Sequence, residues 1–112
     1  MAKKLFKNYT YSFDSNERKI LSTFCKQALN QMSADEKFYR EVKVFQSILE
    51  KLQEGKDETK LTKDESTKLS LHIKENVKNI EKQIDKSWFI KKWLLRSMYK
   101  QYNSILQNHF TN

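Results

Sequence analysis

The sequence contains no proline and only one glycine among its 112 residues. Sandwiches and barrels need many tight turns, and tight turns depend on these two residue types. We therefore exclude an all-β fold. Hydrophobic residues make up 38% of the chain and charged residues 32%, which suits helices that each contribute one apolar stripe to a core. The prediction is an all-α protein: a small three- or four-helix bundle with an extended aromatic N-terminal arm.

Cysteine and long apolar runs are also scarce. Cys25 is the only cysteine, so no internal disulfide can form and a reducing compartment fits best. We expect its thiol to be buried in a helix rather than reactive. The longest apolar runs have three residues, too few to span a membrane, and the N-terminal residues lack the apolar region of a secretory signal. These absences predict a cytoplasmic protein.

Motifs that carry catalysis are missing as well. The sequence has no glycine-rich phosphate loop, no HExxH and no CxxC. His72 and His109 are isolated, because neither has a second histidine or a cysteine one helical turn away to complete a metal-binding face. We therefore expect no enzymatic activity, no metal and no cofactor.

Acidic residues are absent after Asp85. Residues 86–112 carry five basic side chains, residues 1–13 carry three lysines, and residues 14–85 hold 14 basic and 14 acidic residues. The net charge of +8 thus arises at the two ends, which favours an anionic partner. Solubility and the codon bias of an AT-rich genome explain the lysine excess equally well.

Residues 1–13 form the predicted arm. Tyr9, Tyr11 and Phe13 alternate with small polar residues, which is the period of a strand. No other segment resembles a partner strand, and an unpaired strand leaves its amides without hydrogen bonds. We therefore expect the arm to lie extended on the bundle through its aromatic side chains.

Four helical segments are predicted in one domain of residues 14–112, at about 15–32, 34–54, 63–85 and 88–110, because apolar residues recur there at three- and four-residue steps. The first three segments open with the spacing of a capping box, in which two side chains satisfy free amides of the first turn. The pairs are Asp14 with Glu17, Ser33 with Glu36, and Thr62 with Glu65.

A glycine and a shift of apolar register mark the other helix ends. Gly55 follows the second helix, where a left-handed terminal residue is favoured, and we expect the charged loop 55–60 to be exposed. The apolar pattern of the third segment is broken at Ser87 and Lys91, and a new pattern starts at Trp88. We favour a break and a fourth helix over one continuous helix.

Two apolar faces are predicted for the C-terminal helix when its residues are placed at about 100° steps. A core face about 180° wide includes Leu94 and, as its one charge, Lys91. A second face, here called the basic–aromatic face, holds large aromatic residues that a helix packed only in a bundle does not need. The core face contains Trp88, Leu95, Tyr99, Tyr102 and Leu106. The basic–aromatic face consists of Phe89, Lys92, Trp93, Arg96 and Lys100.

We predict a non-catalytic binding or regulatory protein that docks this face, together with Lys3, Lys4 and Lys7, on the acidic surface of a protein partner. The short, lysine-rich sequence is typical of accessory or inhibitor proteins of bacteria, phages and plasmids. Nucleic acid is the first alternative, because cations contact phosphates and aromatic rings stack on bases. A membrane surface is the second. The third is that the N-terminal arm, or a second copy in a homodimer, covers the aromatic residues.

Overall fold

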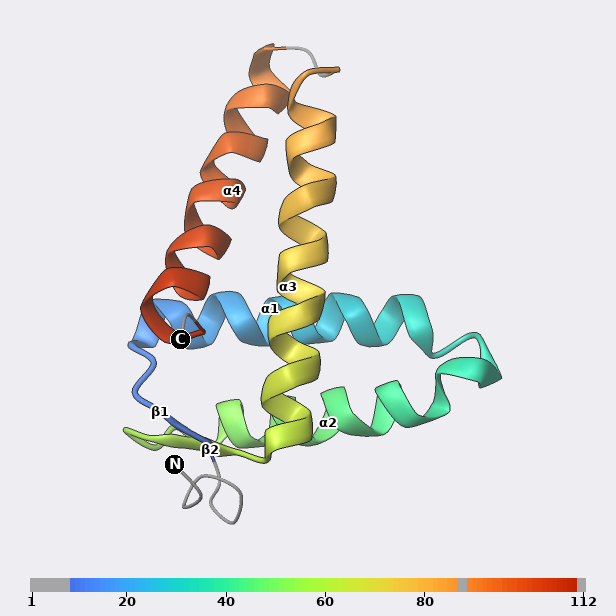
Figure 1. Ribbon diagram of the computed structural model, residues 1–112, viewed down its shortest axis with the longest axis vertical. Coiled ribbons are helices and arrows are strands. Elements are labelled where there is room, and N and C mark those ends of the chain that lie inside the picture. Colours follow the sequence, from blue (N-terminus) through green and yellow to red (C-terminus); the bar gives the residue numbers. More distant parts are fainter. Residues whose placement is uncertain (1–8, 87–88, 111–112) are drawn as a thin grey trace. The chain divides into compact units, whose positions relative to one another are not determined.

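The computed structural model describes residues 9–86 and 89–110 (Figure 1). In this part of the chain four α-helices account for most residues, and the strands form one two-stranded sheet. The prediction of a small all-α protein is therefore confirmed. Lys3, Lys4 and Lys7 of the predicted binding surface, and Trp88 of the predicted core face, lie outside the described residues.

The chain divides into two compact units, Met1–Lys68 and Leu69–Asn112. The first unit holds β1 (Tyr9–Tyr11), α1 (Ser15–Met32), the short 3-10 helix η2 (Glu36–Phe38), α2 (Tyr39–Gln53), β2 (Thr59–Leu61) and the start of α3 (Lys63–Ile84). The second unit holds the remainder of α3 and α4 (Phe89–His109).

Helix α1 has the predicted bounds, and the predicted capping box fixes its start. The Asp14 carboxylate accepts a hydrogen bond from the Glu17 amide at 2.7 Å, and the Glu17 carboxylate accepts one from the Asp14 amide at 3.0 Å. Helix α1 packs against α2, and Cys25 is fully buried, as predicted. The buried apolar residues of the two helices are Leu21, Phe24, Cys25, Met32, Phe45, Ile48 and Leu52.

The predicted start of the second helix at Ser33 is wrong. Ser33 closes α1 instead, because its amide donates to the Leu29 carbonyl oxygen at 2.9 Å and its hydroxyl donates to the same oxygen. A serine hydroxyl can bond back to the carbonyl four residues earlier instead of forward to an amide. The next helical turn begins after Asp35, whose carboxylate accepts from the Lys37 amide at 3.1 Å, and α2 starts at Tyr39.

Gly55 adopts the left-handed conformation predicted for it, with a φ of +72°, just beyond the end of α2. The prediction of an exposed loop through residue 60 is wrong in part. Thr59 is buried, as is Leu61, and β2 pairs antiparallel with β1 in the register Tyr9 with Leu61 and Tyr11 with Thr59. The described part of the N-terminal arm, which begins at residue 9, is thus extended, as predicted, but it has the partner strand that we did not expect.

The start of α3 is tied to α2 through one buried carboxylate. Thr62 and Glu65 form the predicted capping box: the Glu65 carboxylate accepts from the Thr62 amide at 2.8 Å, and the Thr62 hydroxyl accepts from the Glu65 amide at 3.1 Å. Glu65 also accepts from the Ser47 hydroxyl at 2.5 Å and from the Lys51 ammonium at 2.6 Å. Both donors lie on α2, so Glu65 caps one helix and binds another.

In the second unit, α3 ends at Ile84 and α4 begins at Phe89, so two separate helices are present, as predicted. They run in opposite directions (Figure 1). Within the described residues no helix has an apolar stretch long enough to cross a membrane. The buried apolar residues of the unit are Leu69, Ile73, Val77 and Ile80 on α3, and Leu95, Tyr102, Ile105 and Leu106 on α4.

Candidate functional site

Helix α4 combines a narrow buried stripe with a broad accessible face. At about 100° per residue, its buried residues span roughly 100° of the helix circumference, from Ile105 to Leu106. The stripe is narrower than the predicted core face. Two residues assigned to that face are exposed, Leu94 at 54% and Lys91.

Trp93 is the most exposed of the large hydrophobic residues in the described part of the chain, at 73%. No ring or cation contact to its indole is found among those residues. Leu94 lies beside it and is also more than half exposed. Single exposed apolar residues are ordinary on protein surfaces, but here two adjacent ones are uncovered. Burying a fully exposed side chain as large as leucine stabilises a complex by roughly 1.5–3 kcal/mol.

Tyr39, at the start of α2, provides a contrast. Its ring is 62% exposed, but the Lys43 ammonium lies 4.9 Å from the ring centroid, within the range of a cation–π interaction. Acidic residues are also present in this segment, at Asp35, Glu36 and Glu41. Tyr39 therefore has a cation partner within its own chain and stands in a segment of mixed charge.

The cations of α4 lie on one side of Trp93. Around the helix axis, Lys100 lies about 20° from Trp93, Arg96 about 60° and Lys92 about 100°, all in the same direction. Leu94 lies about 100° from Trp93 in the opposite direction. Arg96 and Lys100 are exposed and Lys92 is half-buried. The ion pairs found in the described residues involve other lysines, so none neutralises these three cations.

The two lysines in the first turn of α4 destabilise that helix. The positive end of a helix dipole favours acidic residues in the first turn and disfavours basic ones, by about 0.3–1 kcal/mol each. Helix α1 has Glu17 in its first turn, and α3 has Asp64 and Glu65. Helix α4 has no acidic residue there and instead carries Lys91 and Lys92. A local rule broken in this way often marks a functional surface.

The structure brings four of the predicted site residues onto one face of α4: Lys92, Trp93, Arg96 and Lys100. Phe89 is the first residue of the helix. Leu94, which was assigned to the core face, is also exposed, but it lies about 160° from Arg96 around the helix and is therefore not part of the basic–aromatic face.

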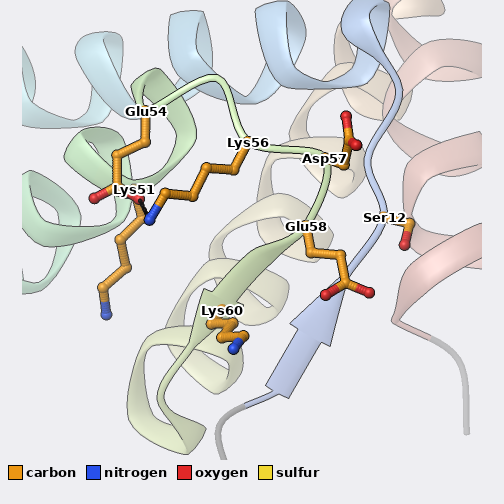
Figure 2. A pocket seen from close by; sticks show the side chains of 7 residues that line it. All are labelled: Ser12, Lys51, Glu54, Lys56, Asp57, Glu58 and Lys60. Carbon is orange, nitrogen blue, oxygen red and sulfur yellow. Dashed lines mark ion pairs between the residues drawn. The ribbon is translucent and has the colours of Figure 1, made fainter.

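A polar depression of about 850 Å³ opens elsewhere, in the first unit (Figure 2). It carries three lysines and three carboxylates, and the Lys56 ammonium lies 3.6 Å from the Glu54 carboxylate. Because charges of both signs line the depression, its electrostatic field favours neither an anionic nor a cationic ligand. Its lining residues are Ser12, Lys51, Glu54, Lys56, Asp57, Glu58 and Lys60.

In the described part of the chain, metal-ligating side chains do not gather at one place, and Cys25 is buried. Among the described residues, no three histidine, cysteine or acidic side chains lie close enough to hold a metal ion. Burial raises the pKa of the Cys25 thiol to about 12, which keeps it protonated at neutral pH.

Comparison with protein-family models, with curated proteins and with solved structures found no match. The class of the protein therefore rests on its own features. It is an all-α chain whose α4 carries exposed apolar and basic side chains on one face.

Proposed function

We propose that this is a non-catalytic binding or regulatory protein that docks the basic–aromatic face of α4 on an acidic surface of a protein partner. The observation that carries the proposal is the exposure of Trp93 beside Arg96 and Lys100 on a helix without a carboxylate. Tryptophan and arginine are enriched among the residues that anchor protein interfaces. Lysine stems can cover apolar surface while their charges meet acidic groups.

The composition of the basic–aromatic face disfavours a membrane surface. The same face becomes polar and uncharged at Gln101 and Ser104, which gives it little apolar area for insertion into a membrane surface.

The charge of α4 also disfavours a homodimer through this face. A twofold interface sets the same surface against itself, so the cations of each copy would face a surface that carries the same cations and no carboxylate. Like charges brought together at an interface disfavour that pairing by several kcal/mol. An acidic partner has the opposite effect.

The test is co-purification of the tagged protein from a nuclease-treated extract of its native cells, followed by reconstitution with each purified candidate. Trp93→Ala with Arg96→Ala is expected to abolish binding and to leave the circular dichroism spectrum unchanged, because both side chains are exposed. Leu71→Ala with Lys74→Ala is the matched control, since it removes one exposed hydrophobic side chain and one exposed charge at the same spacing on α3. Undiminished binding by the α4 variant would contradict the proposal, and a partner that co-purifies from an untreated extract but not from the nuclease-treated one would show that nucleic acid is bound instead.

A further inference from the structure

The three cations of the basic–aromatic face recur at four-residue steps. Lys92, Arg96 and Lys100 occupy positions i, i+4 and i+8 of α4. Four residues of an α-helix rise about 6 Å, so the cations form a ridge roughly 12 Å long. Rows of residues four apart are also the ridges through which helices most often pack on one another.

Apolar surface lies beside this cationic ridge. The indole of Trp93 borders it, and Leu94 lies farther from the ridge, about 100° around the helix from Trp93. Both side chains are more than half exposed. Gln101 and Ser104 continue the exposed face without charge. The footprint is therefore a cationic ridge with the exposed indole of Trp93 along its edge, confined to the N-terminal half of α4, and Leu94 lies outside it.

We propose, on the basis of the proposed function, that the partner contacts α4 with an amphipathic helix that carries carboxylates at four-residue steps along one edge of its apolar stripe. The stripe covers Trp93, and the carboxylates face the cationic ridge. A helix matches because its own residues at i, i+4 and i+8 repeat at the same step of about 6 Å, about as far apart as the cations.

A β-strand fits this footprint less well. Residues on one face of a strand form a single row, because neighbouring side chains point to the opposite face. One row cannot supply an apolar stripe and a parallel acidic ridge together. A helix presents both, since its side chains are distributed around the axis.

The test uses three synthetic helical peptides of about six turns that share a leucine stripe. The ridge peptide has glutamates at i, i+4 and i+8 along one edge of the stripe. The scattered peptide has as many glutamates on the opposite face, and the neutral peptide has glutamine in their place. Fluorescence anisotropy of the labelled peptides at low salt measures their affinity for the full-length protein. Equal charge in the first two peptides isolates the effect of geometry.

We expect the ridge peptide to bind about tenfold more tightly than the scattered peptide, the combined effect of three exposed ion pairs. Arg96→Gln with Lys100→Gln should remove most of this difference. Lys74→Gln with Lys78→Gln should preserve it, because that exposed pair has the same spacing on α3.

The contact with Trp93 is tested separately from the charges. Leu94→Gln should leave the affinity of both peptides unchanged, because Leu94 lies about 160° from Arg96 around the helix. Trp93→Ala should weaken both by at least about 30-fold, as expected for a central anchor.

The outcomes separate this inference from the proposed function. Equal affinities for the ridge and scattered peptides, or no binding of the ridge peptide, would overturn the helical partner. The proposed function would then still stand or fall on co-purification. Tighter binding to single-stranded DNA or to anionic phosphatidylglycerol vesicles than to the ridge peptide, at the same salt concentration, would overturn both.

Discussion

Glu65 is a buried carboxylate held by donors from two helices. Burial raises the pKa of Glu65, but hydrogen bonds from Lys51, Ser47 and Thr62, together with the charge of Lys51, outweigh burial and lower the pKa below its ordinary value. A carboxylate with a depressed pKa in the folded state stabilises the protein above its unfolded pKa, and that contribution is lost as the pH falls through the folded pKa.

We predict that Glu65→Gln lowers the free energy of unfolding at neutral pH by about 1–3 kcal/mol, because a charged acceptor of three hydrogen bonds is removed. The difference between wild type and variant should shrink as the pH falls below about 4.3, the ordinary pKa of glutamate. Urea titrations over this range measure it, with exposed Glu75→Gln as the control. A difference that grows at acidic pH would contradict the ionic role of Glu65.

Cys25 gives a second prediction for a single residue. With a pKa of about 12, roughly one thiol in ten thousand is ionised at about pH 8, and only the thiolate reacts rapidly. We expect Ellman's reagent to modify the native protein at least about 100-fold more slowly than the urea-unfolded protein, because reaction requires opening of the structure. Free glutathione calibrates the reagent. Immediate labelling of the native protein would show that the thiol is accessible.

The stability of a helix depends on the residues at its ends, and Gly55 lies just beyond the end of α2. Its φ of +72° favours glycine, and a β-carbon placed there would meet no atom within 4 Å. Gly55→Ala should therefore lower the free energy of unfolding by about 1–2 kcal/mol through backbone strain alone. Gly55→Asn should lower it less, because asparagine tolerates this conformation. Urea unfolding measures both variants, with exposed Glu54→Ala as the control, and an alanine variant as stable as wild type would contradict the explanation.

Helix starts were the most predictable elements, because a capping box is a local pattern. The pairs that begin with Asp14 and Thr62 form as their spacing predicts. Ser33 has the same spacing to its acidic partner, but its hydroxyl bonds back to Leu29. Nothing in the spacing shows which of the two bonds forms, because the choice depends on where α1 ends.

Strand β2 was not predictable from its own residues. It has three residues, and Lys60 stands between the buried Thr59 and Leu61, so the alternating pattern is too short to recognise. Its pairing depends on β1, which is distant in the sequence. Strand β1 is held further by a hydrogen bond between the Tyr11 and Ser66 hydroxyls, a contact that periodicity does not reveal.

At the scale of the whole chain, the distribution of charge was predictable from the sequence, whereas the exposure of individual side chains was predictable only in part. The cationic ridge of α4 follows from residue spacing alone. The lack of acidic residues after Asp85 is read directly from the sequence. The exposure of Leu94 does not follow from spacing, because other parts of the fold decide which sector of a helix is covered. The residues of the proposed surface therefore follow from their spacing in the sequence, whereas the width of the buried stripe beside it is identified only by the structure.

The distribution of net charge leads to a prediction about binding rates. Replacing Lys3, Lys4 and Lys7 with glutamine removes three of the eight net charges and leaves +5. Charge acts over about 10 Å at moderate ionic strength and accelerates encounter with an oppositely charged partner. We expect this variant to bind the ridge peptide with an association rate several-fold lower at low salt, and with an almost unchanged dissociation rate.

The α4 variant Arg96→Gln with Lys100→Gln should differ from the N-terminal variant in its dissociation rate. Contacts formed in the complex act mainly on dissociation, so its dissociation rate should rise even in salt that abolishes the effect of the N-terminal lysines. Stopped-flow anisotropy across a salt series measures both rates. A salt-independent rise in dissociation for the N-terminal variant would mean that those lysines contact the partner directly, and the docking surface would then extend beyond α4.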